Sequence, residues 1–374
     1  MKIPLAQPDI TNLERRAVLD VLKTPYLSLG PKLKEFEKKI AKLAQVKYAV
    51  AVNSGTSALH LIVKALDIKD GDEVITTPFS FIASANCILF ERAEPVFVDI
   101  DPLTLNIDPV KIEEKITKKT KAILAVDIFG HPAEWDKISK IAEKYKLKVI
   151  EDSAEAIGSE YKGEKCGGFG DAAIFAFYPN KQIVAGEGGV VLTNSKNIAE
   201  LAESMTNQGR EVKDGKWLEH VRLGFNYRLD EMSCALGLAQ LSRIKKLLSK
   251  RDKVVNEYNK RLKGFIEIEV PYAAPNVKVS RFVYVVKLKK KYGQKHKDKI
   301  IEEMIKRGAY CSDYFTCIHL QPFYRKMFGY KKGSFPIAEN TSERTIALPF
   351  FNNLKEKEID YVVKNLKEII TKLK

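Results

Sequence analysis

Between residues 46 and 194, short apolar runs alternate with longer segments in which apolar residues recur every three or four positions. The short runs predict strands and the longer segments predict helices. Strands that are apolar on both faces and are joined by helical crossovers require a mostly parallel sheet between layers of helices. The pattern therefore predicts an α/β fold. The predicted strands are 47–52, 72–77, 94–100, 121–126, 146–152, 172–177 and 189–194, and the predicted helices are 57–66, 80–91, 109–117, 134–145 and 196–206.

The pattern changes in the last third of the chain. The predicted elements there are a long helix at 230–262, a strand at 281–288, a basic helix near 294–307 and a closing helix at 355–372. A chain of 374 residues has room for two domains at roughly 100–200 residues each. We therefore predict a large α/β domain over 1–245, with a mixed, mostly parallel sheet, and a smaller α+β domain over 246–374.

Positive charge is in excess, with 63 Lys and Arg against 48 Asp and Glu and a net charge of +15. Such an excess can indicate a nucleic-acid or anionic partner. Here, however, Lys and Glu alternate along amphipathic stretches such as 32–43 and 111–121, as they do on solvated helix faces. The charge therefore predicts a solvated surface and no nucleic-acid partner.

No segment reaches the roughly 18 consecutive apolar residues of a membrane span, and the first residues lack the apolar core of a secretory signal. The five cysteines show no C-x-x-C pair and no zinc-ligand spacing with histidine. These features predict a cytoplasmic protein with reduced thiols, no membrane contact and no metal site.

Ligands of parallel α/β sheets bind beyond the carboxyl ends of the strands, which makes the residues after each strand the first candidates for a site. One strand runs into a hydroxyl-rich turn that opens a helix at residues 53–57. Backbone N–H groups at such a helix start, with the Thr56 and Ser57 hydroxyls, predict a phosphate site. An ordinary helix cap by Ser54 or Thr56 is the alternative.

Two further strand ends carry charged side chains. Glu151 and Asp152 end an apolar strand, where a buried carboxylate needs a cation or several hydrogen bonds. The protonated ring nitrogen of a cofactor would be such a cation, and a helix-capping Asp is the alternative. Lys181 lies between the strands at 172–177 and 189–194, beside aromatic residues and a glycine-rich patch. A lysine held away from water can act as an amine nucleophile or a general base.

A fourth strand end places Phe79 and Phe81 where either ring could lie over a planar ligand. Core packing is the alternative for both rings and fits Phe79 better. Together, a phosphate-binding helix start, a carboxylate after a strand and a lysine are the contacts that pyridoxal 5′-phosphate requires. The lysine binds the aldehyde of the cofactor, and the carboxylate holds the proton of its ring nitrogen.

With these motifs the sequence resembles the DegT/DnrJ/StrS family of sugar aminotransferases, which have fold type I of the pyridoxal-phosphate enzymes. The resemblance runs nearly end to end. The stretches that carry it are LSLGPKLKEFE (27–37), NSGTSAL (53–59), TPFSFIASANCI (77–88), EDSAEAIGS (151–159), FAFYPNKQIVAGEGG (175–189), GFNYRLDEMSCALGLAQL (224–241) and IHLQPFY (318–324).

The resemblance implies roles for individual residues. Lys181 would bind the cofactor and carry a proton between the cofactor and the sugar carbon. Asp152 would pair with the ring nitrogen, and Phe81 would stack on the ring. Ala176 departs from the Ser of many members, whose hydroxyl binds the phosphate, so this position offers no such hydrogen bond. The residues that would hold the phosphate are Gly55, Thr56 and Ser57.

Four more positions follow from the same resemblance. Glu155 lies where members place a polar side chain near the 3-oxygen of the cofactor. Asn226 would reach the phosphate in the neighbouring subunit, which implies a homodimer with shared active sites. Arg228 and His319 would contact a sugar nucleotide.

The implied reaction moves the amino group of L-glutamate to the ketone of a nucleotide-linked sugar, for polysaccharide or glycoconjugate synthesis. GEGG at 186–189 and HLQP at 319–322 look more like enzymes of 4-keto-6-deoxy sugars than of 3-keto sugars. The alternatives are a 3-keto sugar substrate, or a regulatory or binding protein built on the same fold.

Overall fold

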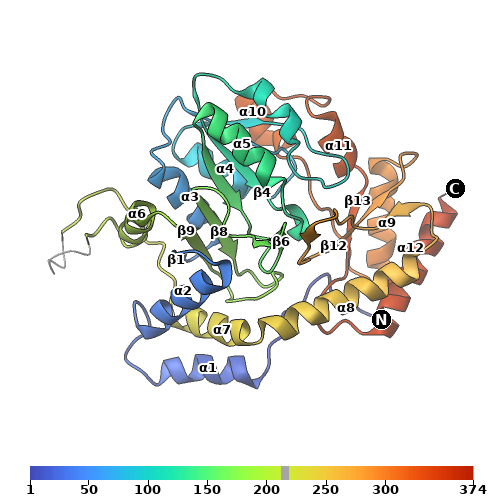
Figure 1. Cartoon of the computed structure of the whole chain (residues 1–374). Helices are drawn as coiled ribbons and strands as arrows, with labels where there is room; N and C mark the ends of the chain where they lie inside the picture. The colour runs from blue at the N-terminus through green and yellow to red at the C-terminus, as the bar shows by residue number, and fades with distance from the viewer. Residues whose placement is uncertain (212–218, 374) are drawn as a thin grey trace.

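A seven-stranded sheet forms the centre of the protein, seen in a computed structural model that describes residues 1–211 and 219–373 (Figure 1). The strand order is β1-β9-β8-β5-β4-β2-β3, and only β9 runs against the other six. The mixed, mostly parallel sheet and the α/β class are confirmed. The strands are β1 (Tyr48–Val52), β2 (Glu73–Thr76), β3 (Glu94–Phe97), β4 (Thr120–Val126), β5 (Lys148–Asp152), β8 (Ala172–Ala176) and β9 (Gly189–Thr193).

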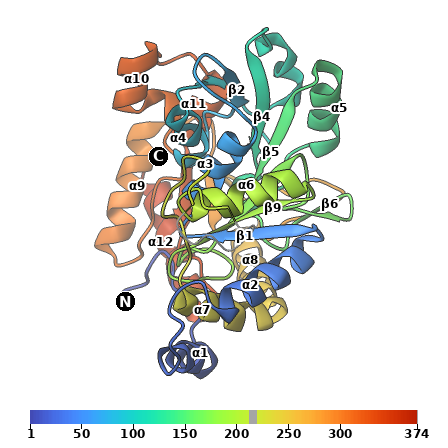
Figure 2. The ribbon, with the colours of Figure 1, turned by 90° about the vertical axis from the view of Figure 1, so that its left-hand side faces the viewer.

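Helices cover both faces of the sheet because its strands send alternate side chains to opposite sides. Val50 of β1 packs into one core and Ala51 into another. The first face is covered by α3 (Gly55–Ala65), α4 (Ala83–Phe90) and α6 (Lys196–Thr206), and the second by α2 (Pro31–Ala44), α5 (Trp135–Tyr145) and α7 (Glu231–Ser242). Helix α1 (Asn12–Leu22) lies outside α7 and projects at one end of the molecule (Figure 2).

A second, smaller sheet lies in the C-terminal part of the chain. Its strands are β10 (Ile268–Glu269), β12 (Tyr284–Leu288) and β13 (Thr345–Leu348), and its core is completed by α8 (Ile244–Leu262), α9 (Gln294–Lys306) and α12 (Glu356–Lys372). Ile3 also belongs to this core, and Tyr324 and Phe335 pack into the larger one. The N-terminus of the predicted large domain therefore packs into the core of the predicted small domain, and part of the small domain packs into the core of the large one. Tyr324 belongs to the short helix α10 (Pro322–Phe328), which precedes α11 (Pro336–Ser342).

The remaining elements are short. A three-stranded ribbon consists of β6 (Glu160–Tyr161), β7 (Glu164–Lys165) and β11 (Val277–Lys278). Ile128–Gly130 and Ile318–Leu320 each form a single turn of 3₁₀ helix. Within the described part of the chain, no helix combines the length and the apolar composition needed to cross a membrane.

Two helix predictions are wrong in detail. Residues 109–117 form two 3₁₀ turns, Pro109–Lys111 and Glu113–Lys115, because the backbone is already extended at Ile116. The segment 230–262 is two helices that meet at Arg243. The Arg243 guanidinium forms ion pairs with Asp9, at 3.0 Å, and with Glu14 of the N-terminal segment. These contacts fix the junction between α7 and α8.

Glu231 is a buried carboxylate at the start of α2. Its oxygens accept the backbone N–H groups of Gly30, Lys32 and Leu33 at 3.1, 2.8 and 2.8 Å. A Cβ on Gly30 would lie 2.7 Å from Glu231 Oε2, so the glycine of the LSLGP stretch permits this approach. The contact satisfies free N–H groups of the helix and complements its dipole.

Replacing Glu231 with alanine should lower the free energy of unfolding by about 2–4 kcal/mol, because the buried N–H groups lose a charged acceptor. Urea titration followed by circular dichroism measures this change. Glu35→Ala is the control, since Glu35 on the same helix pairs with Lys32 and Lys39 at the surface and should change stability by less than about 1 kcal/mol. Equal losses in the two variants would contradict the prediction.

Candidate active site

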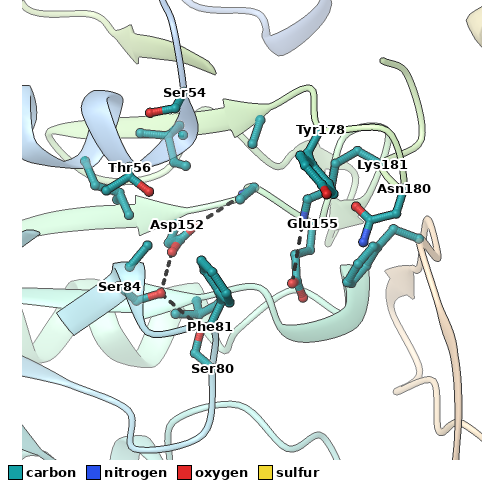
Figure 3. Close-up of a pocket in the computed structure, with 18 of the residues that line it drawn as sticks. Ser54, Thr56, Ser80, Phe81, Ser84, Asp152, Glu155, Tyr178, Asn180 and Lys181 are labelled. Carbon is teal, nitrogen blue, oxygen red and sulfur yellow. Dashed lines mark hydrogen bonds and ion pairs between the residues drawn. The ribbon is translucent and has the colours of Figure 1, made fainter. Parts of the chain in front are cut away.

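A cavity of about 440 Å³ opens where β5 and β8 end and α3 begins (Figure 3). This is the edge of the sheet at which ligands of parallel α/β folds bind. The predicted residues Gly55, Thr56, Phe81, Asp152, Glu155 and Lys181 all line it. The structure therefore brings together, in one cavity, residues that lie up to 126 positions apart in the chain.

Lys181 reaches the cavity from the connection between β8 and β9. Its side chain is 13% exposed, and Nζ lies 3.5 Å from Glu155 Oε1. The ammonium also lies 4.2 Å from the centroid of the Phe282 ring, which is cation–π distance. Arg251 of α8 donates a hydrogen bond of 2.8 Å to the Lys181 carbonyl. The lysine is thus fixed at its backbone and enclosed at its amine.

Asp152 ends β5 and points into the cavity. Its Oδ2 accepts the Ser84 hydroxyl at 2.7 Å, and its Oδ1 accepts the Ala154 N–H at 3.2 Å. Burial raises the pKa of Asp152, and its two hydrogen bonds and the charge of Lys181 act in the opposite direction. Among the described residues, none forms an ion pair with it. The Asp152 carboxylate can therefore form an ion pair with a cationic group of a ligand in the cavity.

Glu151, the other candidate carboxylate on this strand, points to the opposite face because side chains alternate along β5. Its oxygens accept the N–H groups of Gly167 and Phe169 at 2.6 and 2.7 Å, and Ser153 bridges it to Asp127. Burial raises the pKa of Asp127 to about 6, and burial together with the Asp127 charge raises the pKa of Glu151 well above its usual range. This pair does not line the cavity.

The start of α3 forms the end of the cavity opposite Lys181 (Figure 3). Ser54 caps the helix by accepting the Ser57 N–H at 3.1 Å, which is the helix cap considered as an alternative for this turn. The same turn also lines the cavity. Ser57 does not line the cavity, because its hydroxyl donates to Asn53 Oδ1 at 2.7 Å. A Cβ on Gly189 would lie 2.4 Å from Ser54 O, so a glycine is needed where β9 meets this turn.

The two phenylalanines differ as expected. Phe79 is fully buried in the core, whereas Phe81 is 59% exposed and lines the cavity. Glu155 lies beside Lys181, and its Oε2 accepts the Phe129 N–H at 2.9 Å. Burial raises the pKa of Glu155, partly offset by the charge of Lys181.

Besides Ser57, three predicted residues lie outside the cavity of this chain. Asn226 is exposed, and Arg228 donates to Asn207 Oδ1 at 3.0 Å. His319 has no exposed surface, and its ring nitrogen Nε2 lies 3.0 Å from Glu339 Oε1. As placed, His319 packs in the core and does not reach a ligand in the cavity.

Sequence reasoning missed several residues of the site. Ser84, which binds the carboxylate of Asp152, lies on α4 and carries no pattern that separates it from other helix serines. Phe282 contacts the Lys181 amine from the C-terminal part of the chain, where it reads as a strand residue. The hydroxyl of Tyr314, another cavity residue, accepts Asn180 Nδ2 at 3.3 Å. Only its place just before the IHLQPFY stretch could have indicated it.

The residues of the cavity fit pyridoxal 5′-phosphate. A buried carboxylate without a described cationic partner suits a protonated ring nitrogen, and burying it unpaired would be unfavourable. The enclosed Lys181 amine suits an aldehyde. The first backbone N–H groups of α3, at the end of the cavity formed by Gly55 and Thr56, suit a phosphate.

Comparisons with known proteins agree with this fit. The model of the DegT/DnrJ/EryC1/StrS aminotransferase family matches residues 8–367. The chain is 36% identical to the GDP-perosamine synthase of Caulobacter vibrioides over 99% of its own length and 98% of that protein. Its structure matches PseC of Helicobacter pylori, an aminotransferase involved in the biosynthesis of pseudoaminic acid, with a TM-score of 0.94, 31% identity and full coverage of both chains.

A second solved structure is the PLP form of Spr1654 from Streptococcus pneumoniae, with a TM-score of 0.95, 28% identity and full coverage of both chains. The matches extend over nearly the whole chain and include the segments that build the cavity. Sequence, cavity and comparisons lead to one assignment: this chain belongs to the DegT/DnrJ/EryC1/StrS family of sugar aminotransferases, enzymes that depend on pyridoxal 5′-phosphate.

Proposed function

We propose that the protein transfers the amino group of L-glutamate to the ketone of a nucleotide-linked 4-keto-6-deoxyhexose. The observation that carries this proposal is the meeting of Lys181, Asp152 and the start of α3 in one cavity. Pyridoxal phosphate supplies an electron sink and carries the amino group between the two substrates.

Lys181 is the residue that binds the cofactor and moves the proton. Its Nζ takes the proton from the carbon of the amino donor and later delivers one to the sugar carbon. Glu155, 3.5 Å from Nζ, holds the ammonium form when the amine is not bound to the cofactor.

The other cavity residues bind and orient. Asp152 keeps a proton on the ring nitrogen, and Ser84 holds the carboxylate in place at 2.7 Å. Phe81 would stack on the ring. The residues that would bind the phosphate are Gly55 and Thr56, with Ser57 acting through the turn. Ala176 supplies no hydroxyl at this end of the cavity, so these groups would carry the phosphate without it.

We further propose a homodimer in which Asn226 and Arg228 serve the partner's cavity. Neither residue lines the cavity of its own chain. Both nevertheless belong to the stretch GFNYRLDE, which resembles a motif of the family. Asn226 would bind the cofactor phosphate of the partner, and Arg228 would attract the anionic diphosphate of a sugar nucleotide.

The choice of sugar rests on two lines of support. Residues 186–189 and 319–322 resemble enzymes of 4-keto-6-deoxy sugars, and a GDP-perosamine synthase is among the relatives. Tyr178, Asn180 and Tyr314 offer hydroxyl and amide groups to a sugar on the side of Lys181. The product would enter polysaccharide or glycoconjugate synthesis. All five cysteines are buried and unpaired, which supports a cytoplasmic location.

The enzyme should convert bound pyridoxal phosphate to its amino form with L-glutamate, and the amino form should then react with a 4-keto-6-deoxyhexose nucleotide. Absorbance spectra follow both steps. We expect kcat/KM for the 4-keto substrate to exceed that for a 3-keto sugar nucleotide by at least about tenfold, because the ketone must lie beside Lys181. Preference for the 3-keto sugar would overturn the choice of carbon, and no response to glutamate would overturn the choice of donor.

A further inference from the structure

Helix α3 contacts two different parts of the molecule, the cavity through its first turn and the segment around Tyr227 through His60. Its first turn forms the phosphate end of the cavity, and His60, one turn later, is 5% exposed and lies outside the cavity. His60 Nε2 lies 2.8 Å from Glu91 Oε1, and Glu91 Oε2 lies 2.8 Å from Lys64 Nζ. His60 Nδ1 lies 3.1 Å from the hydroxyl of Tyr227.

The partners of His60 set the direction of its hydrogen bonds. A carboxylate only accepts, so Nε2 donates to Glu91 and Nδ1 is left to accept the Tyr227 O–H. Burial lowers the pKa of His60, with Glu91 acting in the opposite direction, and the lowered pKa favours the neutral ring in which Nε2 donates and Nδ1 accepts. The chain of contacts therefore ends on Tyr227, the residue that follows Asn226.

His60 also packs against both neighbours of Asn226. Its ring centroid lies 4.8 Å from that of Phe225 and 5.9 Å from that of Tyr227. These two rings stack on each other at 4.8 Å. The backbone between them is held too, because Phe225 O accepts the Gln208 N–H at 2.8 Å and the Tyr227 N–H donates to Thr206 O at 3.0 Å. Asn226 itself remains exposed.

We propose that His60 is a positioning residue for the Phe225–Tyr227 segment, and that it thereby acts on the cofactor site of the partner subunit. This inference rests on the proposed homodimer in which Asn226 binds the partner's phosphate. One helix would then hold the cofactor of its own subunit through its first turn and that of the partner through His60.

Two variants remove the hydrogen bond to Tyr227. His60→Phe keeps an aromatic ring, and Tyr227→Phe deletes one oxygen from a half-buried side chain, so it should fold even where His60→Phe does not. Each should weaken pyridoxal phosphate binding about five- to thirtyfold, and the double variant should lose little more than either. Titration of the visible absorbance of lysine-bound cofactor measures the affinity without turnover. Wild-type affinity in both variants would overturn the proposal.

Mixed dimers decide in which subunit His60 acts. When a His60→Phe subunit is paired with a Lys181→Ala subunit through two affinity tags, the only lysine-bearing cavity receives Asn226 from the subunit with intact His60. Wild-type affinity is expected there. Affinity as weak as in the His60→Phe homodimer would show action within one subunit and overturn the proposal. The reverse dimer, wild type with a His60→Phe/Lys181→Ala subunit, should bind weakly.

Asn226→Ala separates failure of this inference from failure of the shared site. Paired with a Lys181→Ala subunit, Asn226→Ala should regain wild-type affinity if the sites are shared. If it regains affinity and His60→Phe does not, the inference about His60 is wrong and the shared site stands. If neither regains affinity, the shared site is wrong and the inference falls with it.

Discussion

Lys181→Ala should lose at least about 10⁴-fold in kcat for transamination, the largest effect of any single replacement in this chain. The side chain combines two tasks, covalent binding of the cofactor and proton transfer, and no other described lysine lines the cavity. Rapid-quench kinetics with L-glutamate measures the loss. Treatment with borohydride should fix the cofactor to the peptide that contains Lys181 in the wild type, and the variant should bind the cofactor without this fixation.

Two controls make the result specific. Lys196→Ala removes a surface lysine whose side chain is 73% exposed, and it should keep wild-type rates. Lys181→Arg keeps a positive charge beside Glu155 but offers no amine for the aldehyde, so it should be as inactive as the alanine variant. Activity near the wild-type level in Lys181→Arg would show that charge alone is needed and would remove Lys181 from its proposed role.

The sequence predicted this part of the site because its signals are local. Lys181 and Asp152 each lie next to a strand end, and parallel strands bring their carboxyl ends to one edge of the sheet. The strand pattern predicted the seven strands for the same reason, since apolar runs reflect burial on both faces. The alternation of side chains on β5 also explains why Asp152 lines the cavity and Glu151 does not.

The rest of the site depends on contacts between distant segments. Phe282 lies 101 positions after Lys181, and Ser84 lies 68 positions before Asp152. Neither pairing leaves a periodic or compositional trace in the sequence. For His319 the opposite holds, because the sequence indicated a ligand contact that the structure does not show. The residue belongs to a family motif, but the 3₁₀ turn Ile318–Leu320 buries its side chain against Glu339.

Asp152→Asn should lower kcat by about 10³-fold, because an amide cannot hold the proton on the ring nitrogen as a carboxylate does. The replacement keeps the shape of the side chain and an acceptor for Ser84. Kinetics at saturating cofactor separate this loss from weaker binding. Ser84→Ala should give a smaller loss, about tenfold, since it frees the carboxylate without removing its charge.

Asp152→Asn should also be more stable than the wild type when both proteins lack cofactor. Burial raises the pKa of Asp152 in the folded state, so the native protein holds a proton that the unfolded chain releases. Stability therefore falls as the pH rises from the unfolded pKa of about 3.9 through the folded value, and the charged form is destabilising above it. Asn carries no such charge, so the gain in melting temperature should be largest at neutral and alkaline pH and should shrink toward acid.

Adding pyridoxal phosphate should reverse this order. The wild type gains the ion pair with the ring nitrogen, and binding to the native state raises stability in proportion to the logarithm of cofactor concentration over its dissociation constant. Melting curves between about pH 5 and 9, with and without cofactor, test both halves of the argument. A variant that is less stable than the wild type without cofactor at every pH would mean that Asp152 holds the fold together. The predicted result, stabilisation without cofactor and inactivity with it, identifies a carboxylate that is kept for its chemistry at the expense of stability.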